Sequence, residues 1–186
     1  MSRGLVAVVA AVALVAGLLV CWRLLKPPTG RWPAPEWPSI MQVQRTTSGH
    51  RMVAVMERLG SEGRTRLLAT LLADLLVIAG YVALLLCGVA WSEDVVHSPL
   101  SGAAVAAVWA AGALDAVENI ALVVVLTRWR DYAVLTGTPL SDARRTAAGR
   151  SRRPALVARI ATDLKWVLLA SVVLWLLVVS VVALSP

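Results

Sequence analysis

Four long blocks of apolar residues, separated by stretches rich in charge, constrain this chain more than any other feature. A helix that crosses about 30 Å of hydrocarbon needs about 20 predominantly apolar residues, because each backbone polar group must be satisfied within its own segment. The segments that meet this requirement lie at about residues 4–25, 67–91, 100–126 and 159–184. Composition agrees: 16% of the 186 residues are charged, against about 25% in soluble domains.

These blocks predict an all-α fold, a single membrane domain over residues 1–186 that forms an integral membrane four-helix bundle. Residues 4–22 carry no charge and no small-x-small cleavage site follows them, so we expect an uncleaved anchor rather than a signal peptide. The third block is rich in Ala and Gly, which let neighbouring helices approach closely. We therefore expect it to be the central helix.

Two long loops, residues 26–66 and 127–158, join the blocks. Repeated Pro between positions 27 and 38 excludes a helix and favours an extended chain. Helix-start signals at Ser48 and again at Thr138 predict short interfacial helices in these loops. We expect the second of them to end at Gly149, and Pro154 to occupy the first turn of the fourth span.

The distribution of Lys and Arg predicts the orientation, since these residues are retained on the cytoplasmic side. Sixteen of the 18 lie in the two long loops or at their edges, and the short loop at residues 92–99 has none. We therefore expect a plasma (inner) membrane protein with both termini outside and with its net charge of +7 facing an anionic leaflet. Nucleic acid is not an expected partner, because the basic residues only border spans and no nucleic-acid-binding module is present.

The sequence has few metal-ligating residues, which argues against metal-dependent chemistry. Two His and two Cys cannot by themselves form a conventional zinc, haem or iron–sulfur site, and we expect no metal and no cofactor. The sequence also lacks a nucleotide-binding Gly-rich loop, an HExxH pair and a Gly-x-Ser-x-Gly turn. Nucleotide-driven and hydrolytic reactions are therefore not expected.

Ionisable residues inside the spans are the most informative feature for function, because each costs at least about 2.5 to 3.5 kcal/mol in hydrocarbon and such residues usually have a task. Counted along antiparallel helices at about 1.5 Å per residue, these groups lie in one layer about 9 to 16 Å from the cytoplasmic ends of their spans. Helical spacing also puts the polar residues of the third span on one stripe. We expect one buried cluster, formed by Asp74, Tyr81, Asp115, Glu118, Asn119 and Lys165.

The charge balance of this cluster suggests a neutral acid. Three carboxyl groups face one amine, and carboxylates crowded in a low-dielectric site cannot all stay ionised. Asp115 is the deepest of the three and is the expected protonated acid. Glu118 or Asp74 is then the expected partner of Lys165.

The motifs around these residues resemble a known group. Residues 58–64 read Arg-Leu-Gly-x-x-Gly-Arg, residues 115–119 read Asp-x-x-Glu-Asn, and Lys165 is followed by Trp166. This pattern resembles a group of uncharacterised small bacterial four-span membrane proteins over roughly residues 40 to 170. The Asp-x-x-Glu-Asn stripe is the most specific part, and the resemblance implies a fold and a bacterial source but no function.

Two functional hypotheses remain open. In the first, the protein handles a lipid or isoprenoid inside the bundle, either by binding it or as an enzyme whose protonated acid starts terpene-cyclase-like chemistry. Its expected catalytic residues are Asp115, Glu118 and Asp74, and its expected ligand-binding residues are Asn119, Lys165, Tyr81, Trp166 and Trp109. In the second, the protein is structural or accessory, its polar layer fixes helix packing, and a membrane protein or a second copy is its partner.

Overall fold

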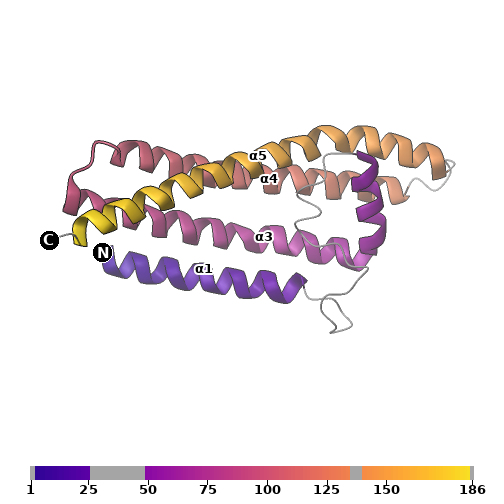
Figure 1. Cartoon of the computed structure of the whole chain (residues 1–186). Helices are drawn as coiled ribbons and strands as arrows, with labels where there is room; N and C mark the ends of the chain where they lie inside the picture. The colour runs from indigo at the N-terminus through magenta and orange to yellow at the C-terminus, as the bar shows by residue number, and fades with distance from the viewer. Residues whose placement is uncertain (1–2, 26–48, 135–139, 185–186) are drawn as a thin grey trace. The chain divides into compact units, whose positions relative to one another are not determined.

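The computed structural model describes residues 3–25, 49–134 and 140–184, and the structure below is that of these residues. Nearly all of them are helical, and the described residues contain no strand, so the predicted all-α class is confirmed. The helices, labelled in Figure 1, are α1 (Arg3–Leu25), α3 (Gly49–Val96), α4 (Ser101–Val134) and α5 (Leu140–Leu184).

Each helix contains a stretch long and apolar enough to cross a membrane. Within the described residues these stretches are 7–24, 62–96, 101–127 and 152–183, which match the four predicted blocks. Half of the α4 stretch is buried, against 11 to 17% of the other three, as expected of a central helix rich in small residues. The large apolar side chains exposed along α1 and α5 suit a lipid environment rather than water.

The predicted interfacial helices begin close to where they were expected, but they do not end before the spans. α3 begins at Gly49 and continues into the second span, and α5 begins at Leu140 and runs through Gly149 into the fourth. Pro154 lies inside α5 rather than in its first turn. The edge of a membrane does not require a helix to stop, and extending an existing helix fixes one residue per new hydrogen bond without a second nucleation cost. The Pro-rich stretch at 27–38 lies outside the described residues.

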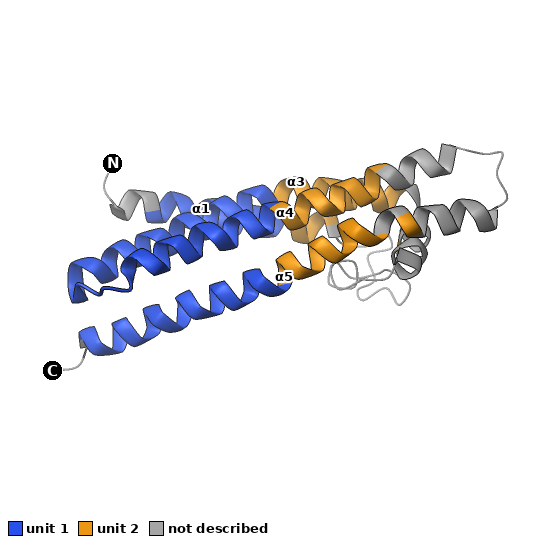
Figure 2. Cartoon of the chain, turned by 90° about the horizontal axis from the view of Figure 1, so that it is seen from above, with its two compact units in different colours: residues 1–19, 74–116, 163–186 blue, residues 20–73, 117–162 orange. Residues whose placement is uncertain are grey.

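The chain divides into two compact units, shown in blue and orange in Figure 2. Unit 1 comprises residues 1–19, 74–116 and 163–186, and unit 2 comprises residues 20–73 and 117–162. Each unit therefore takes a segment from every helix. The two are described separately below.

In unit 1, α1 and α3 pack through two glycines. A Cβ atom built on Gly80 would lie 2.8 Å from the backbone N of Leu14 and 2.9 Å from its Cα. A Cβ atom on Gly17 would lie 2.8 Å from Cγ2 of Val77. Moving from position 14 to 17 on α1 moves the contact from 80 to 77 on α3, so the helices are antiparallel. The absence of side chains at both glycines is what lets the two backbones approach so closely.

The other three helices of unit 1 meet in an apolar core. Val82 of α3, Val108 of α4 and Val172 of α5 are all buried and form its centre. Gly112 of α4 faces Val82, and a Cβ atom on this glycine would lie 2.8 Å from Cγ2 of that valine. α3 and α4 therefore pack closely at the level where the polar residues begin.

Unit 2 has a core of its own, drawn from the same three helices. Its buried side chains are Leu67, Leu71, Ala121, Leu122, Val125, Leu126, Ala155 and Ala158. In the same unit, Cys21 of α1 lies with its Sγ 3.8 Å from the backbone oxygen of Thr70 in α3. Apolar packing in this unit therefore holds α3, α4 and α5, and α1 lies against α3.

A tight turn at residues 97–100 joins α3 to α4. His97 has a φ of 50°, in the left-handed region, and its backbone N–H donates to the Glu93 oxygen at 3.1 Å. This is the arrangement of a helix C-terminus closed by a left-handed residue. The backbone oxygen of Ser98 then accepts hydrogen bonds from the backbone N–H and the hydroxyl of Ser101, the first residue of α4. The antiparallel course of α3 and α4 in unit 1 follows from this turn.

Candidate functional site

Asp115 is the centre of a polar cluster in unit 1 that joins three helices. Its side chain lies on α4 and is buried. Lys165 of α5 places its Nζ 2.5 Å from Asp115 Oδ1, and the Tyr81 hydroxyl of α3 donates to Asp115 Oδ2 at 3.0 Å. Each oxygen of the carboxylate therefore has a partner on a different helix. We call these three residues the Asp115 cluster.

Local packing brings the tyrosine to the carboxylate. Gly112 lies one turn before Asp115 on α4, and Val82 follows Tyr81 directly on α3. Because Gly112 has no side chain, Val82 can pack against α4 at this level. This close approach leaves the Tyr81 hydroxyl within reach of the carboxylate one turn farther along α4.

The contact between Lys165 and Asp115 is a buried ion pair. The two side chains are 8% and 9% exposed, so water screens the pair little. Desolvation makes such a pair costly to bury, and the attraction balances that cost when the geometry is good and further hydrogen bonds satisfy the charged groups. The Tyr81 hydroxyl supplies one of those bonds. In addition, Lys165 Nζ lies 5.7 Å from the ring centroid of Trp166.

The observed partner of Lys165 differs from the expected one, and the neutral acid stays a prediction. Asp115 was expected to be the neutral acid, with Glu118 or Asp74 opposite Lys165, but the lysine contacts Asp115 itself. Depth along the helix was the wrong criterion, because the direction in which each side chain points decides the pairing.

Glu118 and Asn119 follow on α4 but belong to unit 2. Both are buried, with exposed fractions of 0% and 4%. They precede the apolar core residues Ala121 and Leu122 of the same unit. A fully buried glutamate in a membrane-spanning helix fits the predicted importance of this stripe. That Glu118 and Asn119 form one site with Asp115 stays a prediction.

The remaining predicted residues are less buried than Asp115. Asp74 lies in the α3 segment of unit 1 and is half-buried. Trp109 of α4 and Trp166 of α5 are 60% and 61% exposed, so their rings largely face outward. Of the predicted ligand-binding residues, Tyr81 and Lys165 contact Asp115 directly. Tyr81 and Trp166 lie at the Asp115 cluster, but the exposed rings of Trp109 and Trp166 do not enclose a buried ligand there.

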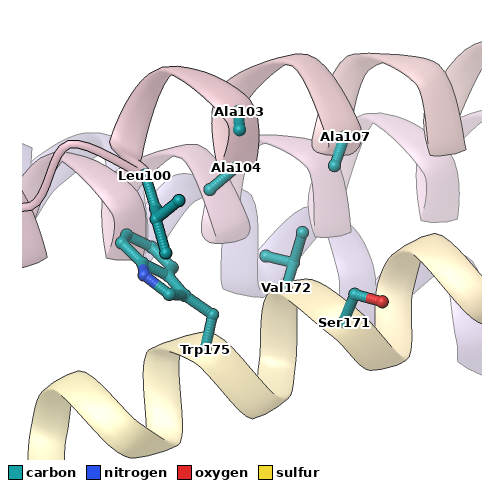
Figure 3. Close-up of a pocket in the computed structure, with 7 residues that line it drawn as sticks. All are labelled: Leu100, Ala103, Ala104, Ala107, Ser171, Val172 and Trp175. Atoms are coloured by element: carbon teal, nitrogen blue, oxygen red, sulfur yellow. The ribbon is translucent and has the colours of Figure 1, made fainter.

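An apolar groove between α4 and α5 of unit 1 was not predicted from the sequence. Its volume is about 230 Å³. As Figure 3 shows, Trp175 and Leu100 lie close together, and alanines of α4 face Ser171 and Val172 of α5. The lining residues are Leu100, Ala103, Ala104, Ala107, Ser171, Val172 and Trp175. The sequence shows the alanines of α4 and the tryptophan of α5. It does not show that they lie opposite each other, because that depends on the register of α4 against α5.

Among the residues that the structure describes, no three His, Cys, Asp or Glu side chains are grouped so that they could hold a metal ion. The polar cluster is instead one acid, one amine and one phenol. That combination suits an ion pair or the binding of a polar group within a membrane.

Comparison with known proteins identifies no relative. No family model, no curated protein and no solved structure matches the chain.

Proposed function

We propose that this chain is a lipid- or isoprenoid-handling protein of the plasma membrane. In this proposal both termini lie outside, the long basic loops lie in the cytoplasm against anionic lipid, and the handled molecule reaches the protein from within the bilayer. The support for the orientation is the concentration of Lys and Arg in residues 23–66 and 128–159.

The observation that carries the proposal is the Asp115 cluster inside stretches that can span a membrane. Asp115 lies within the α4 stretch 101–127, Tyr81 within the α3 stretch 62–96, and Lys165 within the α5 stretch 152–183. Ionisable residues at such positions are rare, costly and usually functional. A molecule that meets them from the bilayer must itself partition into hydrocarbon, which favours a lipid or isoprenoid.

The proposal is of binding and handling, without a proton donated by Asp115. An acid that starts cyclisation must carry a proton when the substrate arrives. Both oxygens of Asp115 already have partners on neighbouring helices, Lys165 at Oδ1 and Tyr81 at Oδ2. The cluster thus supports a role for Asp115 in arranging α3, α4 and α5 around the handled molecule.

Mass spectrometry of lipid retained by the purified protein tests this proposal. Wild-type protein, extracted in mild detergent, should retain a lipid or isoprenoid enriched over the membrane extract. Asp115→Asn and Glu118→Gln should reduce that enrichment, because each removes a buried ionisable group from the bundle. Glu62→Gln is the matched control, since Glu62 pairs with Arg66 at an exposed position. Enrichment equal in all four proteins, or absent from wild type, would refute the proposal.

A structural or accessory role is the second candidate, and one observation favours it. Both oxygens of Asp115 have partners on neighbouring helices, as expected of a cluster that fixes helix packing. In that case Asp115→Asn lowers the melting temperature and changes no retained lipid. The pair of measurements, retained lipid and melting temperature, therefore separates the two candidates.

Reporter fusions test the orientation. A reporter active only outside the cytoplasm, fused after Pro186, should be active. The same reporter inserted at Gly137, in the second long loop, should be inactive. The reverse result would contradict the proposed topology.

A further inference from the structure

We propose that the groove between α4 and α5 binds a single hydrocarbon chain of a lipid whose headgroup carries no net negative charge. The inference deepens the proposed function, on which it rests, by naming a place and a class of ligand. The groove belongs wholly to unit 1 and has a volume of about 230 Å³. Its lining, drawn in Figure 3, supplies the first argument.

The groove offers few polar groups to a ligand, and the indole N–H of Trp175 is the main one. Six of its seven lining residues are Ala, Leu, Val or Trp. The seventh, Ser171, donates its hydroxyl to the Val167 backbone oxygen of its own helix at 2.8 Å. A ligand with polar atoms at this depth would lose hydrogen bonds to water and replace few of them. A hydrocarbon chain loses nothing and gains contact with Val172 and the Trp175 indole.

The size of the groove excludes a helix as its occupant. A helix with side chains is about 10 to 12 Å wide, and a specific protein interface buries at least about 1,000 Å². Seven residues around about 230 Å³ are too few for that. The volume is also below the roughly 300 to 1,000 Å³ typical of small-molecule pockets. A slender chain fits, whereas a bulky fused ring system does not.

Acidic residues near one end of the groove disfavour a lipid headgroup with net negative charge. Leu100 lines the groove and belongs to the turn after α3. α3 ends just before this turn with Glu93 and Asp94, both exposed. The segments of α3, α4 and α5 in unit 1 contain no Lys or Arg other than Lys165. A phosphate headgroup with net negative charge would be repelled there, whereas a zwitterionic headgroup with an ammonium, or a neutral one, would not.

The Asp115 cluster lies deeper along the same helices. Ala107 precedes Asp115 by eight residues and Ser171 follows Lys165 by six, which is about 12 Å along α4 and about 9 Å along α5. The ion pair thus joins the two helices that form the groove walls. The ion pair fixes the distance between α4 and α5 at its own level. At the level of the groove, the small alanine side chains of α4 leave space between the two helices.

Photolabelling tests the inference. The full chain is reconstituted in vesicles of phosphatidylethanolamine and phosphatidylglycerol, doped with either lipid carrying the same diazirine-labelled chain. Labelled peptides should concentrate in residues 100–107 and 171–175. Phosphatidylethanolamine should label them severalfold more than phosphatidylglycerol.

Matched variants sharpen the test. Ala107→Leu fills the groove and should reduce this labelling severalfold, and so should Ala103→Leu, a groove residue that is exposed and tolerates a larger side chain. Ala106→Leu is the control, since Ala106 is exposed on α4 outside the groove and should leave labelling unchanged. Uniform labelling along the lipid-facing helices, or labelling indifferent to Ala107→Leu and Ala103→Leu, overturns the groove. Equal labelling by both lipids overturns the headgroup selection.

The outcome is distinguishable from failure of the proposed function. If wild type retains a lipid that Asp115→Asn loses, but the label lies elsewhere, the groove assignment fails alone. If retained lipid is the same in wild type and Asp115→Asn, the proposed function fails, whatever the labelling pattern.

Discussion

Replacing Lys165 with Met should destabilise the protein strongly, because it leaves the Asp115 carboxylate buried without its cation. The methionine keeps most of the length of the lysine side chain, so the change in packing is small. The change in electrostatics is large, since the contact at 2.5 Å joins side chains that are 8% and 9% exposed. The Tyr81 hydroxyl donates a hydrogen bond to the carboxylate, but it carries no positive charge and cannot replace the lysine.

The expected magnitude follows from two independent estimates. Removing one partner of a buried ion pair costs about 3 to 5 kcal/mol. Placing an unpaired charge at the centre of a spanning helix costs at least about 2.5 to 3.5 kcal/mol. Both point to about 3 kcal/mol, or roughly a hundredfold in the unfolding equilibrium. A triple variant, Lys165→Met with Asp115→Leu and Tyr81→Phe, removes every member of the cluster and should recover most of this loss.

Unfolding in mixed micelles by titration with sodium dodecyl sulfate, followed by circular dichroism, measures these differences. Glu62→Gln is the control: it breaks the ion pair between Glu62 and Arg66, whose side chains are 63% and 31% exposed. Exposed pairs of this kind contribute about 0.3 to 0.5 kcal/mol. If Lys165→Met unfolds together with Glu62→Gln and wild type, the Asp115 cluster is not the buried ion pair argued above. If the triple variant is less stable than Lys165→Met, the cost is one of packing rather than of charge.

Substitutions at three further sites, with matched controls, test other contacts and the turn. Tyr81→Phe removes a hydrogen bond to a charged carboxylate and should cost about 1.5 to 3 kcal/mol in the same titration; an unchanged midpoint would contradict the contact at 3.0 Å. Gly80→Ala should lower the melting temperature, since its Cβ would lie 2.8 Å from the Leu14 backbone N, whereas Gly102→Ala meets nothing within 4 Å and should not lower it; equal effects would exclude close packing of α1 on α3. His97→Gly should raise stability by up to about 1 kcal/mol by relieving the left-handed conformation, and His97→Val should lower it; the opposite order in thermal melts would refute the strain at φ 50°.

The membrane-spanning architecture was predictable because the physical requirement is local. A block of about 20 apolar residues suffices for a span, and all four blocks reappear in the candidate spans of α1, α3, α4 and α5. The helix ends were not predictable in the same way. Gly149 and Pro154 carry local signals for a boundary, yet α5 passes through both. Their cost is local, whereas the continuity of a long helix is a cooperative property of the whole segment.

The candidate site was likewise predictable in part: its members could be named from the sequence, but their pairing could not. Helical spacing identified Asp115, Tyr81 and Lys165 as members of a buried cluster, since residues at fixed intervals share a face whatever the partner helix does. It did not identify which acid pairs with Lys165, nor that Trp109 and Trp166 face outward. Those outcomes depend on the rotation and register of three helices.

The sequence by itself determined that the chain forms apolar helices long enough to span a membrane, and that a few charged residues lie within them. Tertiary structure decided that Asp115 receives Lys165 and Tyr81, and that alanines of α4 leave a groove beside Trp175. The reason is physical: burial in hydrocarbon depends on the composition of one segment, whereas an ion pair or a groove depends on where two segments meet.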